Sequence, residues 1–276
     1  MTNSSQQKQL LTALEWYVDN GLSCIVGDEP VDRTVLPSPA APVFAPMPTA
    51  AAPQTGQDAP AFLGKSDAYD EAVKLAAGAK TLEELRDIIQ SFDGIAIKKT
   101  ASNMVFADGN PKADIMIIGE APEAEEDRVG KPFVGASGEL LDKIVACIGL
   151  SRESEKPEEV VYLSNILNWR PPGNRTPNPS EIEVSLPFIE RHIQLVQPKV
   201  LILFGSVAAK ALLDSTSGIS RLRKNWHDYA PRTKGVGDHK MHAIATYHPS
   251  DLLRTPNQKK AVWMDMLMLQ DKMQEK

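Results

Sequence analysis

The sequence predicts an α/β fold in which helices cover both faces of a parallel sheet. Four short apolar runs alternate with segments of helical periodicity, as in chains that wind strand, helix and strand in turn. The runs are apolar at nearly every position, which is typical of strands buried on both faces. The chain has 276 residues, enough for one domain of about 200 residues and extensions. No apolar stretch reaches the ~18 residues that a membrane span needs, so none is expected.

The apolar runs are the predicted strands, and the periodic segments are the predicted helices. The strands lie at 113–119, 160–165, 199–205 and 241–247. The helices lie near 137–148, 179–196, 206–213 and 257–273, after an earlier helix that reaches about Gln90. Thr81 with Glu84, and Asn178 with Glu181, are spaced as capping boxes at two helix starts.

The chain divides into three parts by composition. Residues 1–33 form an N-terminal helical appendage, because apolar side chains recur at helical spacing over 6–20. This helix either packs on the main domain or docks a partner protein. Residues 34–63 are rich in proline and alanine and form a semi-rigid linker. Residues 64–276 form the main domain.

Charge and cysteine content narrow the class of protein. The formal net charge is −6, which argues against wholesale wrapping of nucleic acid but allows a local basic rim. The two cysteines, Cys24 and Cys147, are too few for a disulfide framework or a thiolate-only metal site. The N-terminus lacks the apolar core of a secretory signal. We therefore expect a cytoplasmic monomer without a cofactor.

Chemically informative segments follow all four predicted strands, where α/β sheets bind their ligands. A carboxylate (Glu120), an amide (Asn165), a Gly-Ser turn and an imidazole (His248) thus converge on one edge. A base flipped out of DNA needs an aromatic platform, which Phe133 offers, and an amide that reads its edge. Cleavage of the glycosidic bond needs a carboxylate near the sugar and a donor near the base. Singly, each residue also suits a cap, a core position or a turn.

Together these segments resemble the family-4 uracil-DNA glycosylases. The resemblance covers roughly residues 92–270 and rests on GEAP, PFVG, RPPGNR, LILFG and HPS-x2-LR in this order. It implies a three-layer α/β/α sandwich around a four-stranded parallel sheet, and excision of uracil from single- or double-stranded DNA. By motif match, Glu120 and His248 take the catalytic positions, Phe133 stacks on the base and Asn165 reads its edge.

The resemblance also implies contacts to DNA. Asn174 is expected beside the scissile nucleotide, and Leu252 as the wedge that fills the vacated base stack. Arg175, Ser250 and Arg254 are expected to contact the DNA backbone. Glu123 replaces the glycine that usually follows GEAP, so we expect it to border the base pocket and to affect substrate choice.

The chain departs from the family at the iron–sulfur cluster. Family-4 members hold a four-iron–four-sulfur cluster with four cysteines, and the matching positions here are Phe92, Ile95, Trp169 and Ser185. No cluster is expected without thiolates, and a hydrophobic plug is expected instead. Three hypotheses stay open: an active cluster-free glycosylase, a catalytically inactive lesion-binding or scaffold protein, and an enzyme of the same fold acting on another nucleotide-derived substrate.

Overall fold

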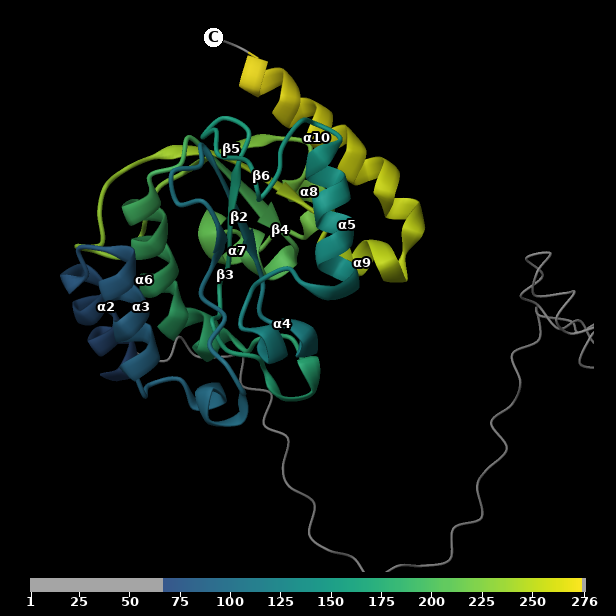
Figure 1. Cartoon of the computed structure of the whole chain (residues 1–276). Helices are drawn as coiled ribbons and strands as arrows, with labels where there is room; N and C mark the ends of the chain where they lie inside the picture. Colours follow the sequence, from purple (N-terminus) through teal and green to yellow (C-terminus); the bar gives the residue numbers. More distant parts are fainter. Residues whose placement is uncertain (1–66, 275–276) are drawn as a thin grey trace, which may run out of the picture. The chain divides into compact units, whose positions relative to one another are not determined.

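A mixed six-stranded sheet forms the centre of the fold (Figure 1). The computed structural model describes residues 67–274, so the predicted helix at 6–20 and the linker at 34–63 lie outside the described residues. The strand order is β1-β3-β2-β4-β6-β5. The strands are Asp108–Gly109 (β1), Ile115–Gly119 (β2), Val161–Asn165 (β3), Val200–Phe204 (β4), Trp226–Tyr229 (β5) and Met241–Thr246 (β6).

The four central strands confirm the four predicted ones. β2 pairs in parallel with β3 and β4, and β4 pairs in parallel with β6. The expected sheet of four strands is nevertheless too small, because β1 and β5 add an antiparallel strand at each edge. β1 has only two residues, and β5 is partly exposed, so neither carries the continuous apolar signal of a buried strand.

Helices cover the two faces of the sheet. They are Asp67–Gly78 (α2), Leu82–Ser91 (α3), Ala124–Val129 (α4), Gly135–Ala146 (α5), Pro179–Val196 (α6), Ser206–Leu213 (α7), Ile219–Leu222 (α8), Pro249–Arg254 (α9) and Lys259–Gln274 (α10). Three 3₁₀ turns lie at Ala96–Thr100, Pro172–Asn174 and Pro256–Gln258. None of the helices within 67–274 is long and apolar enough to cross a membrane.

Alternate residues of each central strand enter two separate hydrophobic clusters, as the period of two in a strand requires. In β2, Met116 and Ile118 pack in one cluster with residues of α2, α3, α6 and α7. Ile115 and Ile117 pack in the other cluster with residues of α5, α9 and α10. Figure 1 shows α2, α3 and α6 on one side of the sheet and α5 and α10 on the other. The layers are therefore helix, sheet and helix.

Of the two predicted capping boxes, the one at Asn178 and Glu181 is complete and the one at Thr81 and Glu84 is only half formed. The Asn178 side chain accepts from the Glu181 amide at 2.8 Å, and the Glu181 carboxylate accepts from the Asn178 amide at 2.9 Å. Thr81 Oγ1 accepts from the Glu84 amide at 3.1 Å. The Glu84 carboxylate bonds the amide of Lys80 in place of that of Thr81. The predicted box at Thr81 therefore lacks its reciprocal hydrogen bond.

The positions expected to replace the iron–sulfur cysteines are part of the core. Phe92, Ile95 and Trp169 are buried in the cluster that faces α2, α3 and α6. The Phe92 ring packs edge-on against Phe188, with ring centroids 5.1 Å apart. Three buried apolar side chains offer no ligand to iron. The described residues contain no group of three or more His, Cys, Asp or Glu side chains that could hold a metal ion.

Trp169→Ala tests whether this apolar packing is part of the folding core. Trp169 is 4% exposed, so its truncation leaves a large cavity and should lower the free energy of unfolding by about 3–5 kcal/mol. Urea denaturation followed by circular dichroism measures this loss. Trp263, which is 42% exposed on α10, supplies the matched control, and Trp263→Ala should cost much less. Equal losses in the two variants would contradict a core role for Trp169.

Candidate active site

Polar side chains from three parallel strands meet at one edge of the sheet. Glu120 directly follows β2, Asn165 is the last residue of β3, and His248 follows β6. The β4 strand ends at Phe204, and Gly205 then leads into the first turn of α7. Because the four strands are parallel, these termini share the carboxyl edge, as the sequence predicts.

A cavity of about 130 Å³ opens at this edge. Most of the residues expected from sequence line it: Glu120, Glu123, Asn174, Arg175, His248, Ser250 and Arg254. The volume is below the ~300 Å³ of an ordinary small-molecule pocket, so it suits one small group. Glu123 is half-buried and lines this cavity together with Glu120.

The Glu120 carboxylate is held by the first turn of α7. The Val207 amide donates to Glu120 Oε1 at 3.0 Å. A Cβ atom at Gly205 would lie only 2.4 Å from the same oxygen, so a glycine is required where the carboxylate approaches the helix. Burial raises the pKa of Glu120, although hydrogen bonds from the Val207 and Ser206 amides oppose the shift. The carboxylate is thus fixed in place and partly desolvated.

His248 is a neutral imidazole in a defined tautomer. Burial lowers the pKa of His248 to about 4, so the ring carries no charge near neutral pH. The Ser250 amide donates to Nδ1 at 3.3 Å, and the Ser250 hydroxyl lies 2.9 Å from the same nitrogen. An Nδ1 that accepts leaves the single proton on Nε2. Ser250, expected at the DNA backbone, therefore orients the imidazole.

Phe133 and Asn165 meet over Gly119. A Cβ atom at Gly119 would lie 2.3 Å from Asn165 Oδ1 and 2.7 Å from the tip of the Phe133 ring, so no side chain fits there. Both side chains are almost completely buried and do not line the 130 Å³ cavity. Asn165 Nδ2 is buried without a hydrogen-bond partner. An unpaired buried donor lowers the free energy of unfolding by about 1–3 kcal/mol, so the position of this amide destabilises the fold.

The Phe133 backbone adopts a conformation that aromatic residues rarely accept. Its φ angle is +53°, in the left-handed region, which costs about 1–3 kcal/mol for such a residue. The ring stacks beside His248, with centroids 5.6 Å apart and planes 25° apart, and meets Phe204 edge-on. The Phe133 ring and the His248 imidazole are therefore adjacent.

The residues expected to contact the DNA backbone already have protein partners. Arg175 forms a two-pronged ion pair with Glu181 at the start of α6. Asn174 Oδ1 accepts from Arg170 Nε at 2.6 Å. Arg254 pairs with Asp251, but both side chains are solvent-accessible, and such pairs contribute little stability. Of the two arginines, Arg254 is the one that can change partner at low cost.

Leu252 does not have the position expected of a wedge. It is 0% exposed and packs in the hydrophobic cluster with residues of α5 and α10. A side chain that enters a base stack has to stand at the surface, and the neighbouring Leu253 does so with 47% exposure. Within α9, Leu252 therefore faces the core and Leu253 faces solvent.

A second, larger cavity of about 740 Å³ adjoins the first. Glu120, Thr176 and Arg254 line both cavities. Lys210 of α7 and Arg232 add positive charge to the larger one. Neither belongs to a motif, so sequence analysis missed them. The helical spacing of Lys210 from Ser206, at the start of α7, is the one signal that could have indicated it.

Sequence comparison identifies related proteins. Residues 106–267 match the profile of the Uracil DNA glycosylase superfamily. The chain is 36% identical over 180 residues to a type-4 uracil-DNA glycosylase of Pyrobaculum aerophilum, covering 63% of this chain and 86% of that protein. It is 34% identical over 179 residues to the type-4 enzyme of Thermotoga maritima, with the same coverage. A type-5 uracil-DNA glycosylase of Pyrobaculum aerophilum is 28% identical over 153 residues, covering 52% of this chain and 64% of that protein.

Proposed function

Because the chain belongs to the uracil DNA glycosylase superfamily, we propose that it is a DNA glycosylase that initiates base-excision repair. Its proposed reaction is hydrolysis of the N-glycosidic bond of uracil, or of another deaminated base, in DNA. The type-4 and type-5 relatives carry the name of this activity. The substrate is a base flipped out of single- or double-stranded DNA.

The unpaired Asn165 amide is the observation that supports this proposal most. A buried donor without a partner suggests that its partner arrives with the substrate. Uracil presents a carbonyl oxygen at C4 and an N–H at N3, which match the donor and the acceptor of an amide side chain. The Phe133 ring, next to Asn165 at Gly119, supplies the face on which the base would stack.

Glu120 and His248 suit the two charges of the transition state. As the C1′–N1 bond breaks, its electron pair leaves with the base and positive charge grows on the sugar. The neutral His248 Nε2–H would donate to the base O2 atom, where the negative charge develops. Glu120 would stabilise the sugar cation or accept a proton from the water that attacks C1′. Because Glu120 acts ionised, excision should slow as pH falls through its raised pKa.

The contacts to DNA outside the base pocket would be made by residues at the edge of the site. Arg254 is proposed to exchange Asp251 for a DNA phosphate, since the existing pair is exposed. Asn174 and Arg175 are proposed to lie along the DNA beside the cavity that they line. The exposed Leu253 is proposed to fill the stack that the base has left.

The proposed reaction predicts alkali-labile abasic sites. Oligonucleotides carrying uracil, hypoxanthine or xanthine, single- and double-stranded, are incubated with the protein and cleaved with alkali. Uracil-containing strands should be cut, and His248→Ala should lower the single-turnover rate about 10²–10³-fold, the value of one preorganised donor.

The control is His242→Ala, which removes an exposed imidazole from the strand that leads to His248. It should leave the rate unchanged. Binding of uracil-containing DNA without cleavage would instead identify a lesion-binding protein. Cleavage of none of the three bases, without such binding, would favour a different nucleotide-derived substrate.

The position of Glu123 leads to a prediction of how thymine is excluded from the site. The side chain lines the cavity beside Glu120, and we propose that it borders the C5 edge of the pyrimidine. A methyl group there would strip water from the carboxylate without offering a hydrogen bond in return. Glu123→Gly should therefore leave uracil excision nearly unchanged and make thymine or 5-substituted uracils detectable substrates.

Glu125→Gly is the matched control. Glu125 is exposed in the first turn of α4, the helix that Glu123 directly precedes, and it does not line the cavity. The same assay on uracil- and thymine-containing strands compares the two variants. If discrimination is the same in both, Glu123 has no pocket role and specificity belongs to Phe133 and Asn165.

A further inference from the structure

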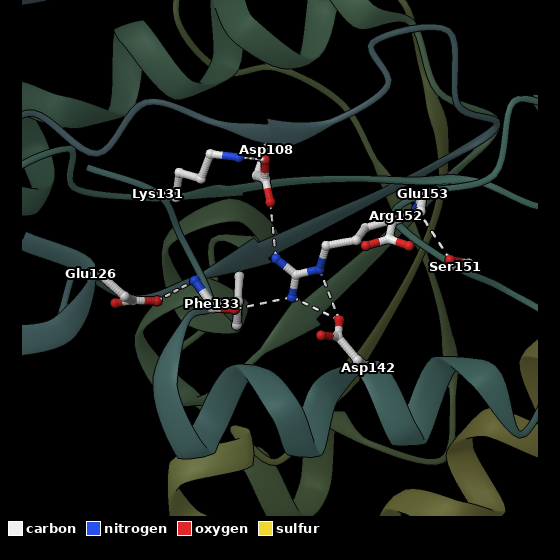
Figure 2. Close-up of polar contacts among 8 residues, drawn as sticks. All are labelled: Asp108, Glu126, Lys131, Phe133, Asp142, Ser151, Arg152 and Glu153. Atoms are coloured by element: carbon white, nitrogen blue, oxygen red, sulfur yellow. Dashed lines mark hydrogen bonds and ion pairs between the residues drawn. The ribbon is translucent and has the colours of Figure 1, made fainter. Parts of the chain in front are cut away.

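The Phe133 backbone is held from both sides by charged side chains (Figure 2). Its N–H donates to Glu126 Oε1, and its carbonyl oxygen accepts from Arg152 Nη2 at 3.0 Å. Glu126 belongs to α4, and Arg152 lies between α5 and β3. Neither bond belongs to a helix or a strand. Two side chains therefore supply the hydrogen-bond partners that other backbone groups supply in secondary structure.

Glu126 connects the segment at Glu123 with the segment at Phe133. Its second oxygen, Oε2, accepts from the Glu123 amide at 2.7 Å. The carboxylate is buried, and burial raises the pKa of Glu126 to about 7 despite the hydrogen bonds from the two amides. Keeping a carboxylate there costs desolvation energy, which the hydrogen bonds from the Glu123 and Phe133 amides offset.

Arg152 is itself fixed by two carboxylates. Its guanidinium meets Asp108 of β1 at 3.0 Å and Asp142 of α5 at 2.7 Å, and 15% of its side chain is exposed. Asp108 also pairs with Lys131 at 3.0 Å. The planar fork of an arginine can hold two carboxylates and a carbonyl in one geometry, which a lysine cannot.

The α5 helix packs closely against the Phe133 carbonyl. A Cβ atom at Gly138 would lie 1.9 Å from this oxygen, so the α5 helix approaches it closely. A glycine at 133 would adopt the left-handed backbone without strain and would need no such support. The support is needed because an aromatic ring stands at this position, beside His248 and over Gly119.

We propose that Glu126 and Arg152 are positioning residues that clamp the Phe133 backbone, so that its ring is already oriented to stack on the flipped base. The inference rests on the proposed glycosylase function and adds two residues to its machinery. Neither residue touches the base. They act through Phe133, and a displacement of the ring by about 1 Å is enough to slow a preorganised reaction on the order of 10²-fold.

The clamp is tested first without any activity measurement. In Glu126→Gln, the side chain keeps one acceptor oxygen for two amides, so the Phe133 amide should exchange its hydrogen with solvent at least about 10-fold faster, as one lost hydrogen bond of ~1.4 kcal/mol allows. Amide exchange measured by NMR on the full chain reports this rate. Unchanged exchange at Phe133 would overturn the clamp, whatever the enzyme does.

Excision kinetics then test the purpose of the clamp. Arg152→Lys should lower the single-turnover rate on uracil-containing DNA about 10-fold to 100-fold. In a Phe133→Leu background the same change should have little further effect, because the group on which Arg152 acts is gone. Additive losses in the double variant would show that Arg152 acts independently of Phe133, and would overturn the proposal.

Arg191→Lys is the matched control. Arg191 also joins backbone carbonyls of separate segments, at Ala79 and Val236, but touches no residue of the site. It should lower the melting temperature as Arg152→Lys does while leaving excision unchanged. Asp142→Asn is a milder variant, since Asp142 is 49% exposed, and serves if Arg152→Lys does not fold.

The excision and amide-exchange measurements distinguish an error in the clamp proposal from an error in the proposed function. Wild-type protein that excises no base would overturn the proposed function, and the exchange rate at Phe133 would still decide the clamp. Active wild-type protein with unaltered excision in Arg152→Lys would retain the glycosylase function and overturn the positioning role.

Discussion

No side chain fits at Gly119, because the Asn165 amide and the Phe133 ring meet directly over its backbone. This contact joins the end of β2, the end of β3 and the turn before α5 at one point. Two further candidate residues adjoin it. Glu120 follows Gly119 in the chain, and His248 stacks beside the Phe133 ring. A larger residue at 119 would displace the Phe133 ring and the Asn165 amide together.

The site holds ionisable side chains in fixed, buried positions at a cost in electrostatic free energy. Burial raises the pKa values of Glu120 and Glu126 and lowers that of His248. The folded protein therefore retains a proton on Glu126 up to about pH 7, whereas an unfolded chain releases it near the ordinary value of 4.5. Stability from this group is present at low pH and is lost as pH rises through about 7. Together with the strained φ of Phe133 and the unpaired Asn165 donor, this is the pattern of a site selected for function over stability.

The sequence predicts the central fold and the site edge because both depend on local signals. Four apolar runs become β2, β3, β4 and β6, and the candidate residues Glu120, Asn165 and His248 lie at or just after strand ends. The edge strands escape prediction because β1 is too short and β5 too polar to carry an apolar pattern. The burial of Leu252 and the exposure of Leu253 depend on how α9 docks on α5 and α10, which no spacing within HPSDLLR encodes. Arg152 reaches Asp108 across 44 positions, so only the folded chain brings the clamp together.

We propose that the buried Asn165 amide reads the pyrimidine edge, and the base preference of Asn165→Asp tests this role most directly. The change keeps the size of the side chain and replaces the Nδ2 donor with an acceptor. Uracil excision should fall, because the C4 oxygen would face a second acceptor, and cytosine, which carries an amino donor at C4, should become a detectable substrate. Single-turnover rates on uracil- and cytosine-containing strands give the answer. Undiminished uracil excision with no gain on cytosine would contradict the account.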